Sequence, residues 1–153
     1  MKRFLIPLGL VLATLTFLVI ANPAHAEERP IAARASGGLT FAVNSPLLVG
    51  EGLATHLGQS VVVVTLDEFE FAQGNFVLRT LEIYGAYDAS LFASVDAAFD
   101  PETGIIAGTI TFTGGAGRFA DATGSADLLI VLDDSAGLFN LTFELGLEGT
   151  INY

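Results

Sequence analysis

The stretch Phe139-Asn140-Leu141-Thr142-Phe143-Glu144-Leu145-Gly146-Leu147-Glu148-Gly149-Thr150-Ile151 alternates in character along its whole length. Its odd-numbered positions are apolar except for Gly149, and its even-numbered positions are polar except for Gly146. A period of two is that of a β-strand with one face in a core and the other face in water. The stretch therefore predicts a half-buried strand near the end of the chain.

The same alternation recurs upstream, and no convincing amphipathic helix interrupts it. The clearest segments are Gly124 to Leu132, Ile106 to Phe112 and Leu91 to Phe99. Further strands are expected at Leu39 to Val43, Glu51 to Leu57, Ser60 to Asp67, and Phe69 to Phe71 continuing toward Tyr84. About eight short strands without helices predict an all-β sandwich or barrel. We favour a closed antiparallel barrel, because closure removes the edge strands that invite aggregation.

The connections between these segments have the composition of tight turns. Asp100-Pro101-Glu102-Thr103-Gly104 combines a proline, which presets φ, with a glycine that is free to take a positive φ. Asp133-Asp134-Ser135-Ala136-Gly137 is a second turn of the same kind. Both turns agree with strands that reverse direction over a few residues.

The N-terminus has the composition of a secretory signal peptide. The basic start Met1-Lys2-Arg3 precedes the apolar run Phe4 to Ile20, and Ala24-His25-Ala26 supplies the small residues that signal peptidase recognises. The sequence thus predicts a signal peptide at residues 1–26 and a secreted or periplasmic location. The polar, alanine-rich residues 27–38 are interpreted as a flexible N-terminal segment, and residues 39–153 as one barrel domain.

The charge of the exported part excludes several classes of function. After cleavage it keeps four arginines and no lysine against all 17 acidic residues. Such a chain has no basic face for phosphates, so we expect no nucleic-acid partner and no attraction to anionic membranes. Without cysteine, disulfides, thiolate metal sites and cysteine nucleophiles are not expected. We expect no cofactor and no metal.

The segment Thr113 to Gly124, T-G-G-A-G-R-F-A-D-A-T-G, is the most distinctive motif. Gly114, Gly115 and Gly117 permit backbone conformations that other residues avoid. Phe119 is a large apolar residue in a polar turn, so we expect it to fold inward as a plug, and the Arg118 fork suits carboxylates or carbonyls at strand ends. The Lys-Ser/Thr pair of a phosphate-binding loop is missing. The motif therefore indicates a structural turn that closes the barrel.

The motif resembles a known family. Gly114-Gly115-x-Gly117-x-Phe119 followed by Ala122-x-Gly124 is similar to the GGTG-x-F-x-x-A-x-G signature of the dirigent and allene oxide cyclase barrels, with Ala116 in place of the usual threonine. Small secreted bacterial proteins share a closer GGTGRF-x-x-ATG loop, together with a stretch like Gly52 to Gly58, G-L-A-T-H-L-G. The resemblance implies an eight-stranded antiparallel barrel, trimeric in plant members. Allene oxide cyclase closes a ring in an apolar cavity, and dirigent proteins steer radical coupling.

Three residues are candidates for catalysis. His56 is the only histidine after residue 26, which argues against a zinc site with three protein ligands and leaves a structural or a general-base role. Glu82 and Tyr84 share a parity with Phe76 and Leu78, and would face inward if that side lines the barrel. An inward carboxyl would have a raised pKa and suit acid–base chemistry. The opposite parity is equally apolar, and in that case Glu82 faces water.

Four functions remain open from the sequence. The first is a secreted barrel that binds a small apolar molecule without catalysis. The second is a metal-free isomerase or cyclase that confines its substrate, with Glu82, Tyr84 and His56 as its site. The third is a structural, self-associating barrel with no ligand. The fourth is an outer-membrane barrel, which the predicted short strands and the scarcity of Tyr and Trp disfavour.

Overall fold

The computed structural model describes residues 27–42, 45–70, 75–137 and 140–153, with side chains omitted for residues 68–70 and 75. The signal-peptide prediction falls on residues 1–26, which lie outside the described residues, as do Val43, Phe71 and Phe139 of three predicted strands. Within the described residues, η1(Gly117–Phe119) is a 3₁₀ turn, Asn140 also has 3₁₀ geometry, and no α-helix is present. No helix there has the length and apolarity of a membrane span.

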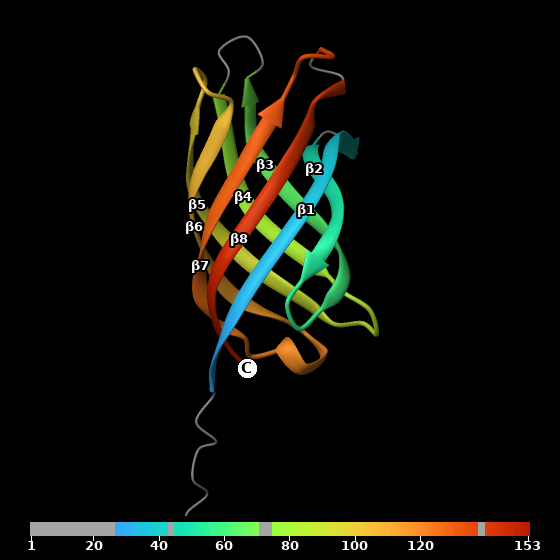
Figure 1. Ribbon diagram of the computed structural model, residues 1–153, viewed down its shortest axis with the longest axis vertical. Coiled ribbons are helices and arrows are strands. Elements are labelled where there is room, and N and C mark those ends of the chain that lie inside the picture. The colour runs from blue at the N-terminus through green and yellow to red at the C-terminus, as the bar shows by residue number, and fades with distance from the viewer. Residues whose placement is uncertain (1–26, 43–44, 71–74, 138–139) are drawn as a thin grey trace, which may run out of the picture.

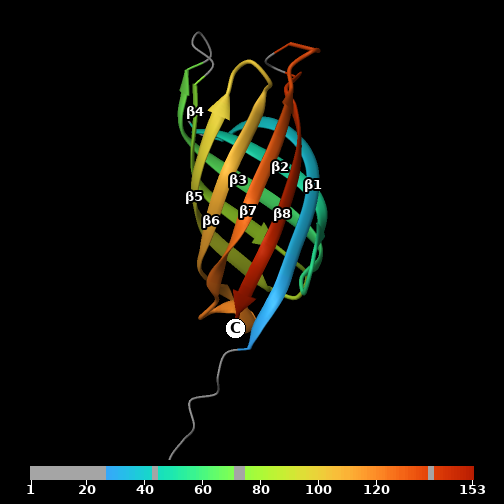
Figure 2. The ribbon, with the colours of Figure 1, turned by 60° about the vertical axis from the view of Figure 1, so that its left-hand side comes forward.

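Eight antiparallel strands form a closed barrel in the order of the sequence, which confirms the predicted fold class. They are β1(Glu28–Ala42), β2(Ser45–Ala54), β3(Gly58–Glu70), β4(Asn75–Tyr84), β5(Ser90–Asp100), β6(Ile105–Ala116), β7(Thr123–Asp133) and β8(Thr142–Asn152). Strand β8 pairs with β1 and closes the ring. Figure 1 shows the strands inclined around the barrel, and Figure 2 turns β5, β6, β7, β8 and β1 toward the viewer.

Most strands are longer than the sequence predicts, at 10 to 15 residues each, although β8 is shorter than the predicted stretch 139–151. The prediction of short strands is therefore wrong, because the apolar alternation fades toward strand ends while the hydrogen-bonded ladder continues. The argument that several strands are too short to span lipid is wrong with it, since about 9–11 residues suffice for a transmembrane strand.

Residues 27–38 are the second correction, since β1 begins at Glu28 and its ladder with β8 runs from Glu28 to Gly38. Ile31, Ala33 and Ala35 face the core, but alanine also occupies position 32 on the outer face, which blurs the period. Pro30 is tolerated because pairing with β2 starts only at Ala33, so that edge needs no N–H at residue 30. The expected flexible segment is an ordered barrel strand.

The core is the inside of the barrel. The inward residues of β6, β7 and β8 follow the predicted alternation, with Ile106, Ile110, Leu128, Ile130, Phe143, Leu145, Leu147 and Ile151 all buried. Ser60 and Ser90 are the buried polar residues of the described chain. The two predicted turns form as expected, with Gly104 at φ 70° and Gly137 at φ 91°.

The two ends of the barrel differ. One end holds η1, the β2–β3 and β4–β5 connections, the start of β1 and the C-terminus, and is called the Phe119 end (Figure 1). The opposite end, which carries the β5–β6 turn Asp100–Gly104, is called the far end. The candidate functional site is described below in terms of these two ends.

Candidate functional site

The glycine motif closes the Phe119 end, as the sequence predicts. Phe119 is fully buried, and its ring centroid lies 4.6 Å from that of Tyr153. Gly114, Gly117 and Gly124 have φ values of 128°, 64° and 127°, which a side chain would strain. Gly115 has no room for a Cβ, which would lie 2.0 Å from the Ser90 carbonyl oxygen. The motif is thus a turn whose glycines let the chain fold Phe119 into the barrel.

Arg118 holds the Phe119 turn in place through contacts with the β2–β3 turn and with two aromatic rings. Its guanidinium donates to the backbone carbonyl of His56, which confirms the prediction that the fork reaches a carbonyl at a strand end. The same group lies over two aromatic rings, 4.9 Å from the centroid of Phe119 and 5.7 Å from that of Tyr153. Planar guanidinium groups stack on aromatic faces in this way. Arg118 therefore links η1, the β2–β3 turn and the C-terminal residue.

His56 lies in the β2–β3 turn in a left-handed conformation, with φ 69°. Its Nε2 is 3.0 Å from the carbonyl oxygen of Pro30, and a carbonyl only accepts, so Nε2 carries the proton. The ring also meets Tyr153 edge-on at 5.7 Å. These contacts tie the turn to β1 and fit the structural role that the sequence left open. General-base activity of His56 stays a prediction.

Glu82 and Tyr84 lie on the outer face of β4. One alternative from the sequence placed the parity of Phe76 and Leu78 inside the barrel, and the other placed the opposite parity there. In the structure Phe76 and Leu78 face the core, but so do Leu81 and Ile83, which have the opposite parity. The two sets differ in parity because the β3–β4 ladder shifts register and leaves Arg79 without a partner in β3. A bulge of one residue exchanges the faces of a strand. The condition for an acid–base role inside the barrel, an inward Glu82, is therefore not met.

The two outer side chains are nevertheless joined, because the Tyr84 hydroxyl donates to Glu82 Oε2. This hydrogen bond, followed by partial burial and the nearby carboxylate charge, raises the pKa of Tyr84 above its ordinary value. Tyr84 stays protonated at neutral pH. His56 contacts Pro30 and Tyr153 rather than Glu82 or Tyr84, so the three predicted catalytic residues do not form one arrangement. Their role in a reaction stays a prediction.

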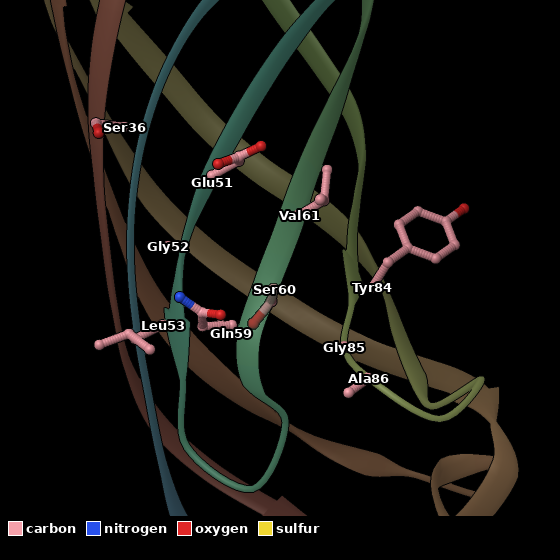
Figure 3. Close-up of a pocket in the computed structure, with 10 residues that line it drawn as sticks. All are labelled: Ser36, Glu51, Gly52, Leu53, Gln59, Ser60, Val61, Tyr84, Gly85 and Ala86. Atoms are coloured by element: carbon pink, nitrogen blue, oxygen red, sulfur yellow. The ribbon is translucent and has the colours of Figure 1, made fainter.

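A shallow groove crosses the outer face beside Tyr84. Glu51, Val61 and Tyr84 stand in a row across β2, β3 and β4, with Leu53 and Gln59 nearer the Phe119 end (Figure 3). Figure 3 shows the Tyr84 ring projecting away from the sheet. The groove is open to solvent, and its lining combines the Glu51 carboxylate with polar uncharged side chains such as Gln59 and with apolar ones such as Leu53. The described residues contain no group of three or more His, Cys, Asp or Glu that could hold a metal.

A partly exposed apolar surface lies on the inner wall toward the far end, and its residues were not among the predicted site residues. On β5, Leu91 and Ala93 are buried, whereas Val95, Ala97 and Phe99, which have the same inward parity, are only half-buried. All three pack against the core cluster. Their parity was readable from the sequence, but their exposure depends on β4, whose bulge has only a weak signal in the sequence.

The half-buried inner wall coincides with a break in the barrel ladder. Within the described residues, β4 and β5 pair from Tyr84↔Ser90 to Thr80↔Ser94 and no further, although both strands continue toward the far end. Phe76 of β4 and Phe99 of β5 meet there edge-to-face, with ring centroids 4.6 Å apart. The contact between these two rings thus connects the two strands in this half.

Comparison with known proteins adds no assignment, since no family, no curated protein and no solved structure matches this chain.

Proposed function

We propose that the protein is an exported barrel of the allene oxide cyclase and dirigent type that binds a small apolar molecule. The observation that carries the proposal is the half-buried inner wall formed by Val95, Ala97 and Phe99. Apolar area in contact with water costs about 25 cal/mol per Å², so a ligand that covers it gains that free energy. The sealed Phe119 end directs such a ligand to the far end.

The distribution of charge supports a barrel that works in water. Asp127, Glu144 and Glu148 are exposed on the outer faces of β7 and β8, beside Arg34 of β1, while the inner faces are apolar. An outer-membrane barrel has the opposite arrangement, with an apolar outer band and a polar interior. The charged outer face therefore favours a barrel that works in water over one inserted in the outer membrane, in place of the reason from strand length.

Binding without catalysis is preferred to the isomerase or cyclase hypothesis. Glu82 and Tyr84 face away from the inner wall, and His56 lies at the opposite end of the barrel from the half-buried residues. An acid–base group would have to lie within hydrogen-bond reach of the reacting atoms. The rival of a structural barrel without ligand, including the trimer that the family resemblance implies, makes the opposite prediction in a binding experiment.

The experiment uses N-phenyl-1-naphthylamine, a neutral apolar dye that fluoresces when shielded from water. Titration of the barrel should give saturable fluorescence. Ala97→Leu adds a larger side chain to the inner wall and should weaken dye binding about ten-fold or more, because the space that the dye would cover is filled. Ala98→Leu adds the same atoms at the next position, on the outer face, and should leave dye affinity unchanged.

Far-UV circular dichroism checks that both variants keep the sheet. Absence of saturable dye binding to the wild type would support the structural rival. Equal weakening by Ala97→Leu and Ala98→Leu would place the dye on the outer surface and overturn the proposed site.

A further inference from the structure

The groove on the outer face of β2, β3 and β4 has a row of three directly opposed residues at its centre. Glu51 pairs with Val61, and Val61 pairs with Tyr84. Neighbouring strands lie about 4.8 Å apart, so the Cα atoms of Glu51 and Tyr84 are separated by about 10 Å. Val61 is 38% exposed and forms an apolar floor between a carboxylate and an aromatic ring.

The Glu51 carboxylate is turned toward this floor and has no partner of its own. Figure 3 shows it directed from β2 toward Val61, with Tyr84 on the other side of Val61. In the part of the chain that the structure describes, no ion pair or side-chain hydrogen bond involves Glu51, and the groove lining contains no cation. Arg34 lies opposite Leu53 in the β1–β2 ladder, at the border of the groove. A positively charged ligand would thus meet an available carboxylate.

The Tyr84 ring is held at the β4 side of the groove by two contacts. Its hydroxyl donates to Glu82 Oε2, and its ring meets Phe92 of β5 edge-on, with ring centroids 6.3 Å apart. Tyr84 nevertheless remains 42% exposed. The face of an aromatic ring attracts a cation within about 6 Å of the ring centroid. Because the ring is already fixed, a ligand loses little free energy in ordering it.

We propose that this groove binds a quaternary ammonium ion, seated on Val61 between the Glu51 carboxylate and the Tyr84 ring. The ring and the carboxylate both attract positive charge, and the methyl groups around the nitrogen suit an apolar floor. A primary ammonium is more strongly hydrated and loses more on leaving water. An anion is repelled by Glu51 and Glu82 and by the formal charge of −11. This second site lies on the outer face and is independent of the apolar inner wall.

The test compares choline with 3,3-dimethyl-1-butanol, which has the same shape but a carbon atom in place of the charged nitrogen. Each is titrated into the exported chain, residues 27–153, and backbone amide chemical shifts are followed by NMR. Salt at about 0.15 M screens attraction beyond about 8 Å, so general attraction to an acidic protein is suppressed. Choline should shift the amides of Glu51, Val61 and Tyr84 saturably. It should bind about ten-fold tighter than the alcohol, because two modest contacts combine.

Two pairs of variants then separate the ring from the charge. Tyr84→Leu should weaken choline binding about three-fold or more, whereas Tyr84→Phe, which keeps the ring, should stay within about two-fold of the wild type. Tyr87→Leu is the control for the ring, because Tyr87 is 99% exposed and does not line the groove. Glu51→Gln should weaken binding about three-fold. Glu148→Gln removes the same charge from the outer face of β8 and should leave choline affinity unchanged.

The contrary outcomes are distinct. Absence of saturable choline binding, or equal affinity for choline and the alcohol, would overturn the site. Equal weakening by Glu51→Gln and Glu148→Gln would assign binding to general charge, and equal weakening by Tyr84→Leu and Tyr84→Phe would remove the role of the ring. Displacement of N-phenyl-1-naphthylamine by choline would place the cation at the inner wall instead. Loss of dye binding alone would overturn the proposed function and leave the outer site standing.

Discussion

The two ends of this barrel shield the apolar interior from water to different degrees. At the Phe119 end, a glycine-rich turn folds a fully buried ring into the barrel, and Arg118 binds the turn to the His56 carbonyl and to the Tyr153 ring. Toward the far end, β4 and β5 lose their ladder beyond Thr80↔Ser94, and inward residues of β5 stay half-buried. One end is packed shut, and the other leaves apolar wall in contact with solvent.

The comparison teaches that the same alternating pattern supports both stability and binding. Leu91 and Phe99 share a strand and a parity, but only Leu91 is enclosed by paired neighbours on both sides. Enclosure, and not hydrophobicity, separates a core residue from a candidate ligand contact. The two phenylalanines, Phe119 and Phe99, allow this difference to be measured with identical substitutions.

The largest expected effect is that of Phe119→Ala. Removing a fully buried phenylalanine costs about 3–5 kcal/mol of the free energy of unfolding, through lost transfer energy and the cavity left behind. Urea-induced unfolding of the chain without residues 1–26 measures it. Tyr87→Ala is the control, because Tyr87 is 99% exposed and its loss should change stability by less than about 0.5 kcal/mol. A Phe119→Ala cost near that of Tyr87→Ala would contradict the account of the sealed end.

Phe99→Ala should have a smaller effect on stability, about 1–2 kcal/mol, because the side chain is only partly buried and gains less from burial than a fully buried ring. Its effect on dye binding should be the larger of the two phenylalanine variants, since Phe99 lines the proposed site and Phe119 does not. Urea-induced unfolding of the two variants ranks their losses of stability, and dye titration ranks their losses of dye affinity. A Phe99→Ala variant that loses as much stability as Phe119→Ala would show that the far end is equally packed.

The smallest expected effect concerns the outer face and separates it from both ends. The hydrogen bond from Tyr84 to Glu82 raises the pKa of Tyr84 above 10.0, so Glu82→Gln should lower that pKa toward its ordinary value. The pKa of Tyr84 is raised in the folded state. The stability from this contact is therefore present below pH 10 and is lost as pH rises through the folded-state pKa. Tyrosinate absorbance of each protein, minus that of its Tyr84→Phe counterpart, isolates this titration.

Glu51→Gln is the matched control for this titration, because it removes the same charge from β2, on the other side of β3, without touching the Tyr84 hydroxyl. A Tyr84 pKa that falls equally in both variants would assign the shift to general charge rather than to the hydrogen bond.

Much of the architecture was readable from the sequence for a simple physical reason. Most inward residues of β6, β7 and β8 alternate with outward polar ones, although Leu129 and Val131 of β7 are apolar and exposed, so a period of two largely determines which face is buried. The turn glycines and the inward Phe119 follow from rules of the same local kind. Residues 28–38 were missed because alanine suits either face of a strand, and only pairing with β2 and β8 identifies this segment as β1.

The candidate site was less predictable, because it depends on register between strands. The faces of β4 exchange at Arg79, which places Glu82 and Tyr84 outside, although their parity with Phe76 and Leu78 is plain in the sequence. Nothing local distinguishes a bulged Arg79 from an ordinary exposed arginine. The oppositely charged Asp67, 12 residues upstream in β3, becomes informative only once β3 and β4 are paired side by side.

The central claim, that the wall is closed near the Phe119 end and open between β4 and β5 toward the far end, is tested most directly by hydrogen exchange resolved by residue. Amides of Leu81, Ile83, Leu91 and Ala93 should be protected as part of the closed wall. Within residues 77–79 and 95–99, the amides that point toward the interval between β4 and β5 should exchange at least about 100-fold faster, because the β4–β5 ladder does not extend beyond Thr80↔Ser94. Uniform protection of β4 and β5 along their whole length would contradict the account.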